Sequence, residues 1–212
     1  MYLLTVFSAF SVLIPLATGL ILFSRLALEL KLLLLLFFIV AIVEGYTFYL
    51  FMNDRNPYWV HHFYAPIEYI IIATVFSFWQ RKSWAKKIIR LSILPFLILC
   101  AWDISGGGDL KDFNAFPISV AYALYVGISA YTLVNLDHGS DKSVARDCRF
   151  WIGTALLIYS AGALAYFSFH DMIVANYLIE IWAAHLILNI IAYILYSVGI
   201  MCEAKAWNRV GA

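Results

Sequence analysis

The sequence predicts an all-α membrane protein in which residues 1–212 form a single domain of seven transmembrane helices. Its composition is the first reason: 64% of the 212 residues are hydrophobic and only 13% are charged, whereas a soluble domain carries roughly 25% charged residues. The second reason is that seven apolar segments each come close to the ~20 residues needed to cross the bilayer core. These continuous runs lack the alternation of a barrel strand, so each is predicted to be a helix.

In chain order, the predicted spans are residues 3–23, 32–52, 58–79, 88–104, 113–134, 150–169 and 178–201. The first span has no basic residue ahead of it and is longer than the apolar region of a typical signal peptide, so we expect it to remain as a membrane helix. Proline occurs in or at the start of the first, third, fourth and fifth spans, at Pro15, Pro66, Pro95 and Pro117. Each of these prolines can kink its helix.

The basic residues predict the orientation, because Lys and Arg are enriched in cytoplasmic loops. With the N-terminus outside and the C-terminus in the cytoplasm, only Arg55 and Lys111 fall outside. The other twelve fall inside: Arg25, Lys31, Arg81, Lys82, Lys86, Lys87, Arg90, Lys142, Arg146, Arg149, Lys205 and Arg209. We therefore expect a multi-pass protein of a bacterial inner (cytoplasmic) membrane.

The ionisable residues within the spans lie mostly in their outer halves. At a rise of 1.5 Å per residue, Glu44 and His185 lie about 10 Å below the outer ends of their spans, and Glu68 and Asn189 about 15 Å. A charged group at the centre of a membrane helix costs on the order of 3 kcal/mol. Such residues are therefore expected to face a cavity or a partner.

Two polar and aromatic stripes follow helical spacing. The third span carries His61, Tyr64, Ala65 and Glu68, and the seventh carries Trp182, His185, Asn189, Tyr193 and Tyr196. As facing walls, they would form one small-molecule pocket that opens outward. The predicted ligand-binding residues are Glu44, His62, Tyr64, Glu68, Trp182, His185, Asn189 and Tyr193. The alternative is that these residues only form hydrogen bonds between helices.

No motif assigns a reaction, so the sequence leaves open whether the protein is an enzyme, and no catalytic residue is predicted. The spans contain no His-x-x-x-His pair, and we expect neither a metal nor a cofactor. Gly106, Gly107 and Gly108 follow no predicted strand and so do not form a nucleotide-binding loop. The basic clusters are explained by topology, and nucleic acid is not an expected partner.

Four short motifs support a resemblance to a family: residues 56–69 (NPYWVHHFYAPIEY), 149–153 (RFWIG), 157–162 (LIYSAG) and 182–191 (WAAHLILNII). Together they resemble an uncharacterised family of small seven-helix bacterial integral membrane proteins. The resemblance covers the whole chain and implies the fold, but no activity. It implies that Tyr64, Glu68, Tyr159, His185 and Asn189 are positions that define the family.

The first functional hypothesis is a sensor or receptor that binds a small ligand or lipid headgroup and signals through a cytoplasmic partner. The second is a membrane-embedded lipid hydrolase, which could depend on a metal. Seven-helix hydrolases of the alkaline ceramidase type bind zinc with several histidines, and this chain departs from their pattern at Asn189. The third is a small transporter whose first and last three spans are parallel repeats. The sequence does not predict the oligomeric state.

Overall fold

All regular structure in the described part of the chain is helical. The computed structural model describes residues 2–105, 110, 115–136, 143–168 and 179–210, and within these ranges it has α-helices and short 3-10 helices but no strands. The predicted all-α class is therefore confirmed for these residues. The elements are α1 (Tyr2–Phe10), α2 (Leu13–Ile21), η1 (Phe23–Arg25), α3 (Leu28–Met52), α4 (Tyr58–Trp79), α5 (Ser83–Leu91), α6 (Ile93–Ser105), α7 (Ala115–Val134), η2 (Val144–Arg146), α8 (Cys148–Ser168) and α10 (Ile179–Val210).

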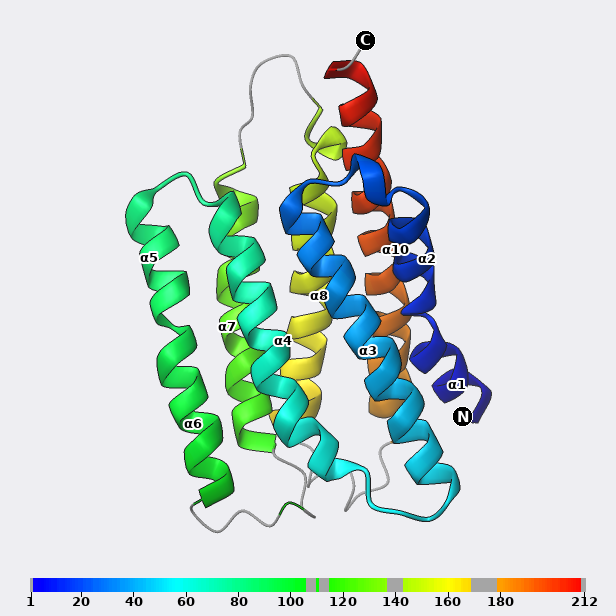
Figure 1. The fold of residues 1–212 in the computed structure, drawn as a ribbon. Helices are drawn as coiled ribbons and strands as arrows, with labels where there is room; N and C mark the ends of the chain where they lie inside the picture. The colour runs from blue at the N-terminus through cyan, green and yellow to red at the C-terminus, as the bar shows by residue number, and fades with distance from the viewer. Residues whose placement is uncertain (1, 106–109, 111–114, 137–142, 169–178, 211–212) are drawn as a thin grey trace.

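Five helical stretches among the described residues are long and apolar enough to cross a membrane. They are Leu3–Ile21, Ser83–Ser105, Ala115–Val134, Cys148–Ser168 and Glu180–Ala206. The 25-residue α3 and the 22-residue α4 lie alongside them in the same bundle (Figure 1). Large apolar side chains such as Leu20, Leu91 and Leu94 remain more than half exposed, as expected for surfaces that contact lipid. These features indicate a multi-pass membrane protein.

Two predicted spans are interrupted, and in each a proline explains the break. Pro15 has no N–H to donate to the carbonyl of Ser11, which instead accepts a bond from Ile14 N at 3.0 Å. The first span is therefore two helices, α1 and α2. In the fourth span the break falls at Ser92, between α5 and α6. Pro95 has no N–H to donate to the carbonyl of Leu91, four positions earlier, where α5 ends. Pro66, by contrast, lies inside a continuous α4.

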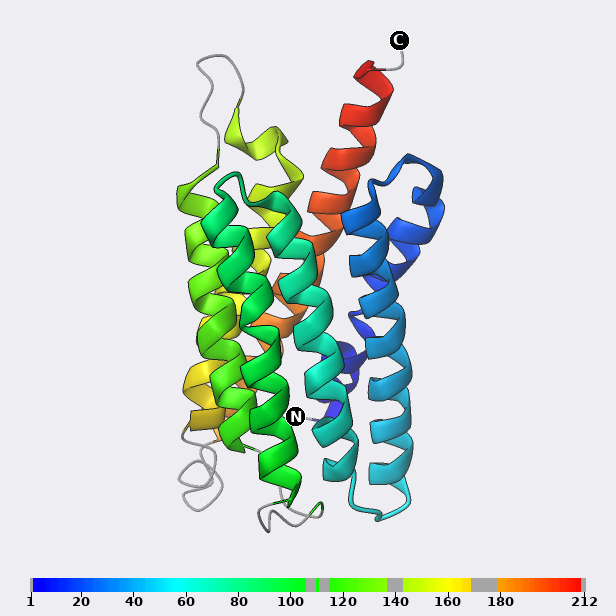
Figure 2. The same ribbon diagram turned by 60° about the vertical axis from the view of Figure 1, so that its left-hand side comes forward.

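The predicted boundaries were wrong at two helices. The fourth span begins at Ser83 rather than residue 88, because α5 buries Ala85 and Ile89 while Lys87 and Arg90 stay exposed. Long basic side chains can extend from an apolar helix toward water, so they did not mark a loop. The last helix continues to Val210 rather than residue 201. Its C-terminal end projects beyond the neighbouring helices (Figure 2).

Six helices form a closed ring. Around it, α3 packs on α4, α4 on α7, α7 on α8, α8 on α10, α10 on α2, and α2 on α3. Helices α5 and α6 pack against α4 on the outside of this ring, α6 also touches α7, and α1 packs against α10 and α3. One face of each of α3, α4, α7, α8 and α10 therefore borders the same interior, and the ribbon shows these helices side by side in one bundle (Figure 1).

The basic residues separate the two ends of the bundle. The C-terminal ends of α2, α4 and α7 lie at the same end of the bundle as the C-terminus, whereas the N-terminus lies in the opposite half and the α3–α4 turn at the opposite end (Figure 1). Of the lysines and arginines whose side chains the structure describes, only Arg55 lies at the end that carries the α3–α4 turn. The end that carries the C-terminus holds Arg25, Lys31, Arg81, Lys82, Lys86, Lys87, Arg90, Arg146, Arg149 and Lys205. Lys111, Lys142 and the side chain of Arg209 lie outside the described residues.

Candidate functional site

The interior of the helix ring holds a group of polar side chains that we call the tyrosine–carboxylate cluster. Five helices contribute to it, and its members are connected by electrostatic interactions, hydrogen bonds and ring contacts. The members are Glu44 from α3, Tyr64 and Glu68 from α4, Tyr122 and Tyr125 from α7, Tyr159 from α8, and Tyr193 and Tyr196 from α10. Residues as far apart in the sequence as Glu44 and Tyr196 thus meet in one place.

Glu68 is at the centre of this cluster. Its carboxyl forms a hydrogen bond with the hydroxyl of Tyr64, one helical turn earlier, and interacts electrostatically with Glu44 across the α3–α4 contact. Glu68 also interacts with Tyr159 and with Tyr193, which lie on the far side of the ring. The predicted residues Glu44, Tyr64, Glu68 and Tyr193 are therefore brought together by the fold.

The tyrosines form a continuous aromatic wall on the α7–α8 side. The hydroxyls of Tyr122 and Tyr159 are 3.3 Å apart, and their rings meet edge to face at 5.6 Å between centroids. Tyr122 also contacts Tyr125 edge to face, at 5.8 Å. Edge-to-face aromatic pairs are favourable. They hold these rings in a fixed arrangement, and all three tyrosines interact electrostatically with Glu68.

Burial differs among the members of the cluster. Tyr122, Tyr125 and Tyr196 are 8%, 0% and 7% exposed, whereas both glutamates are only partly buried, as are the remaining tyrosines. The hydroxyl of Tyr125 makes no hydrogen bond to any described residue. Buried hydroxyls are normally hydrogen-bonded. The cluster therefore combines a rigid buried wall, a tyrosine hydroxyl without a hydrogen-bond partner among the described residues, and two partly buried glutamates.

Neither Glu44 nor Glu68 forms an ion pair within the described ranges. The nearest basic residue before Glu44 on its own helix is Lys31, thirteen positions away, or about 20 Å along the axis. At the other end, Arg55 lies in the exposed α3–α4 turn. The two carboxyl groups thus share an interior to which no described lysine or arginine contributes a charge.

His185 lies beside the cluster in an aromatic environment of its own. Its ring stacks on Tyr166 at 5.0 Å, and the rings of Tyr159, Phe167 and Trp182 lie at 5.6, 5.5 and 6.3 Å. Its Nδ1 atom is buried and has no hydrogen-bond partner among the described residues. Tyr159 is itself a member of the cluster, and Phe167 also stacks on Tyr122, so His185 adjoins the cluster through both rings.

Two predicted site residues make other contacts. His62 is 4% exposed, and its Nδ1 atom lies 3.5 Å from Oδ2 of Asp103, which joins α4 to α6 near the end of the bundle. Asn189 donates from Nδ2 to Oγ of Ser8 at 2.9 Å, which joins α10 to α1. Both contacts link helices. The Asn189 contact in particular is a hydrogen bond between two helices, which is the alternative role considered for these residues in the sequence.

Tyr122 and Tyr125 were missed by the sequence reasoning. They are three positions apart on α7 and so share one helical face. That spacing was visible in the sequence. The fifth span contains no Asp, Glu, His, Lys or Arg that would mark this face as a candidate site.

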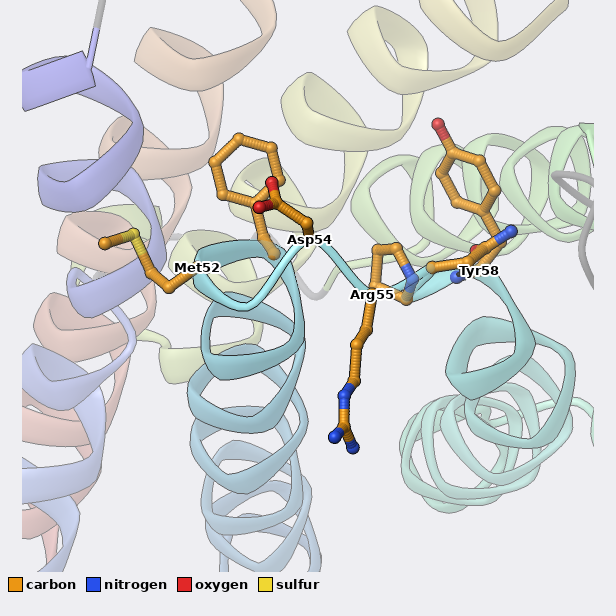
Figure 3. Close-up of a pocket in the computed structure, with 7 residues that line it drawn as sticks. Met52, Asp54, Arg55 and Tyr58 are labelled. Atoms are coloured by element: carbon orange, nitrogen blue, oxygen red, sulfur yellow. Dashed lines mark hydrogen bonds between the residues drawn. The ribbon is translucent and has the colours of Figure 1, made fainter.

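Two surface hollows lie away from the cluster. A hollow of about 550 Å³ at the α3–α4 turn is lined by Phe51, Met52, Asp54, Arg55, Asn56, Pro57 and Tyr58 (Figure 3). Asp54 there has a left-handed backbone, with φ of 52°. The side chains of Asp54 and Arg55 point in different directions (Figure 3). The whole lining comes from one short segment, so this hollow brings together no groups from distant parts of the chain. The other hollow, about 320 Å³ between α2 and α3, is largely apolar.

No group of three or more histidine, cysteine, aspartate or glutamate side chains suited to a metal ion occurs in the part of the chain that the structure describes. His170 and Asp171 lie outside that part. No protein-family model, curated protein or solved structure matches this chain.

Proposed function

We propose that this protein is a seven-helix membrane receptor that binds a small ligand or lipid headgroup at the tyrosine–carboxylate cluster. The convergence of eight polar side chains from five helices supports the proposal. Polar groups are costly inside a membrane and usually mark binding or transport sites. Aromatic walls with a few convergent polar groups are typical of small-molecule sites.

The proposal includes the topology and the location. Helices α3 and α4, together with the five apolar stretches, make seven spans. The N-terminus lies outside and the C-terminus lies in the cytoplasm of a bacterium. The basic end of the bundle would then face the cytoplasm. This orientation places Glu44 about 12 Å and Glu68 about 15 Å from the outer ends of their helices. The ligand would enter from outside, and the projecting end of α10 would contact a signalling partner.

Labelling of single cysteines tests this topology. Cys100, Cys148 and Cys202 are first replaced by alanine or serine, and Asn53→Cys or Ser83→Cys is then introduced at exposed positions at opposite ends of the bundle. In intact cells, a membrane-impermeant maleimide should label Asn53→Cys but not Ser83→Cys until the membrane is permeabilised. The reverse pattern would contradict the proposed orientation.

Ligand binding is tested on the full chain in lipid nanodiscs by thermal shift. The panel contains amines, carboxylic acids, neutral sugars and phosphate esters. At least one class should raise the melting temperature of the wild type, and its effect should be reduced in Glu68→Gln. Glu29→Gln is the matched control, because Glu29 lies at the opposite end of α3 from Glu44. If no class stabilises the folded wild type, the receptor proposal is wrong.

A further inference from the structure

The charges of the tyrosine–carboxylate cluster restrict the chemistry of its ligand. Glu44 and Glu68 interact with each other, and no described residue forms an ion pair with either. When both carboxyl groups are ionised they repel each other, and the repulsion is strong in an interior of low dielectric constant. A buried charge is tolerated when it is paired. A cation bound between the two groups would supply that pairing.

The aromatic residues favour an organic cation. Six tyrosines from four helices interact electrostatically with Glu68, and the negative face of an aromatic ring attracts ammonium groups. Tyrosine hydroxyls can also accept hydrogen bonds from N–H donors. We infer that the ligand carries an organic ammonium group that binds between Glu44 and Glu68, against the tyrosine rings. This inference rests on the proposed function and specifies the class of ligand.

The hydroxyl of Tyr125 provides an independent observation. This side chain is 0% exposed, and its hydroxyl makes no hydrogen bond to any residue that the structure describes. The charged side chain with which it interacts is Glu68. A polar atom buried beside the carboxyl group can therefore accept a hydrogen bond from a ligand bound there.

Matched pairs of ligands test the inference. Choline is compared with its uncharged isostere 3,3-dimethyl-1-butanol, and benzylamine with benzyl alcohol. Binding to the full chain is measured by thermal shift and by isothermal titration in detergent free of choline lipids. At least one cation should bind, with an affinity at least tenfold higher than that of its neutral partner, equivalent to about 1.4 kcal/mol. Equal affinity for the charged and neutral partners, or no binding of either cation, would overturn the inference.

Substitutions then test the site. Glu44→Gln and Glu68→Gln keep the size of each side chain and remove its charge, and each should weaken binding of the cation at least tenfold. Glu29→Gln should bind it like the wild type. Circular dichroism checks that each variant is folded, and if one glutamine variant fails to fold, the other decides the outcome. Unchanged affinity in a folded Glu44→Gln or Glu68→Gln variant would show that the carboxyl pair does not bind the ammonium group.

Two further measurements separate related explanations. Choline binding is compared in nanodiscs with and without phosphatidylcholine to distinguish a lipid headgroup from a free cation. If the lipid competes with choline, the ligand is the headgroup, and if it does not, the ligand is a free cation. Either result upholds the ammonium chemistry. Sodium and potassium chloride are titrated separately, and stabilisation by these ions equal to that by choline or benzylamine would overturn the choice of an organic cation. If only another class of the panel binds, this inference fails while the receptor proposal stands.

Discussion

The contact between α8 and α10 can be tested by adding one methyl group at Gly199. A Cβ atom built there would lie 2.6 Å from Cγ1 of Ile152 and 3.2 Å from the carbonyl oxygen of Cys148. Ile152 is 0% exposed, and its β-branched side chain has little rotational freedom. The backbone carbonyl can move only if the helix moves. Gly199→Ala should therefore push the two helices apart.

The expected effect follows from two opposing terms. Overpacking a tight core costs about 1–3 kcal/mol, while alanine is favoured over glycine within a helix by about 1 kcal/mol. Because neither Ile152 nor the carbonyl of Cys148 can move freely, the cost should fall in the upper part of this range, at about 2–3 kcal/mol. We therefore expect a net loss of about 1–2 kcal/mol for Gly199→Ala. Gly45→Ala is the matched control, because a Cβ atom at Gly45 would have no neighbour within 4 Å. That variant should be as stable as the wild type or more so.

The assay is unfolding of the purified protein in mixed micelles, followed by tryptophan fluorescence during a titration with SDS or a thermal ramp. For a chain of this size, about 1 kcal/mol corresponds to a shift of roughly 2–4 °C in Tm. Gly199→Ala should thus lower Tm by several degrees while Gly45→Ala does not. If both variants melt like the wild type, the close approach of α8 and α10 is wrong. The placement of His185, Tyr193 and Tyr196 on α10 would then be in doubt as well.

Three further predictions concern single contacts and topology. Asn189→Leu removes the hydrogen bond to Ser8 and should destabilise the bundle by about 0.6 kcal/mol, and by less than about 2 kcal/mol, in the same unfolding assay; a larger loss would mean that Asn189 does more than join α10 to α1. His185→Phe removes a buried nitrogen that has no partner among the described residues and keeps a ring among aromatic neighbours, so Tm should be unchanged or higher; a clear decrease would reveal a hydrogen bond essential for stability. A fluorescent protein fused after Ala212 should be active in the cytoplasm, and activity of an alkaline phosphatase fusion at the same position would instead place the C-terminus outside.

The sequence alone was sufficient to predict the helical class and the multi-pass character, because both depend on local composition. A run of about 20 apolar residues must form a helix in lipid, whatever its neighbours are. The same reasoning identified Glu44 and Glu68, since a carboxyl group in an apolar span stands out. Helix ends were less predictable: Lys86 and Lys87 lie on a helix, although the charge pattern assigned them to a loop.

Only the tertiary structure decided which of the polar residues belong together. Asn189 and His185 are one turn apart on the same helix, yet one contacts Ser8 of α1 and the other the aromatic side chains of α8. Tyr122 and Tyr125 join Glu68 because α4 packs against α7, a contact between segments about 55 positions apart. Helical periodicity determines which residues share a face of one helix. The neighbour of that face depends on how all the helices pack, which no local pattern in the sequence contains.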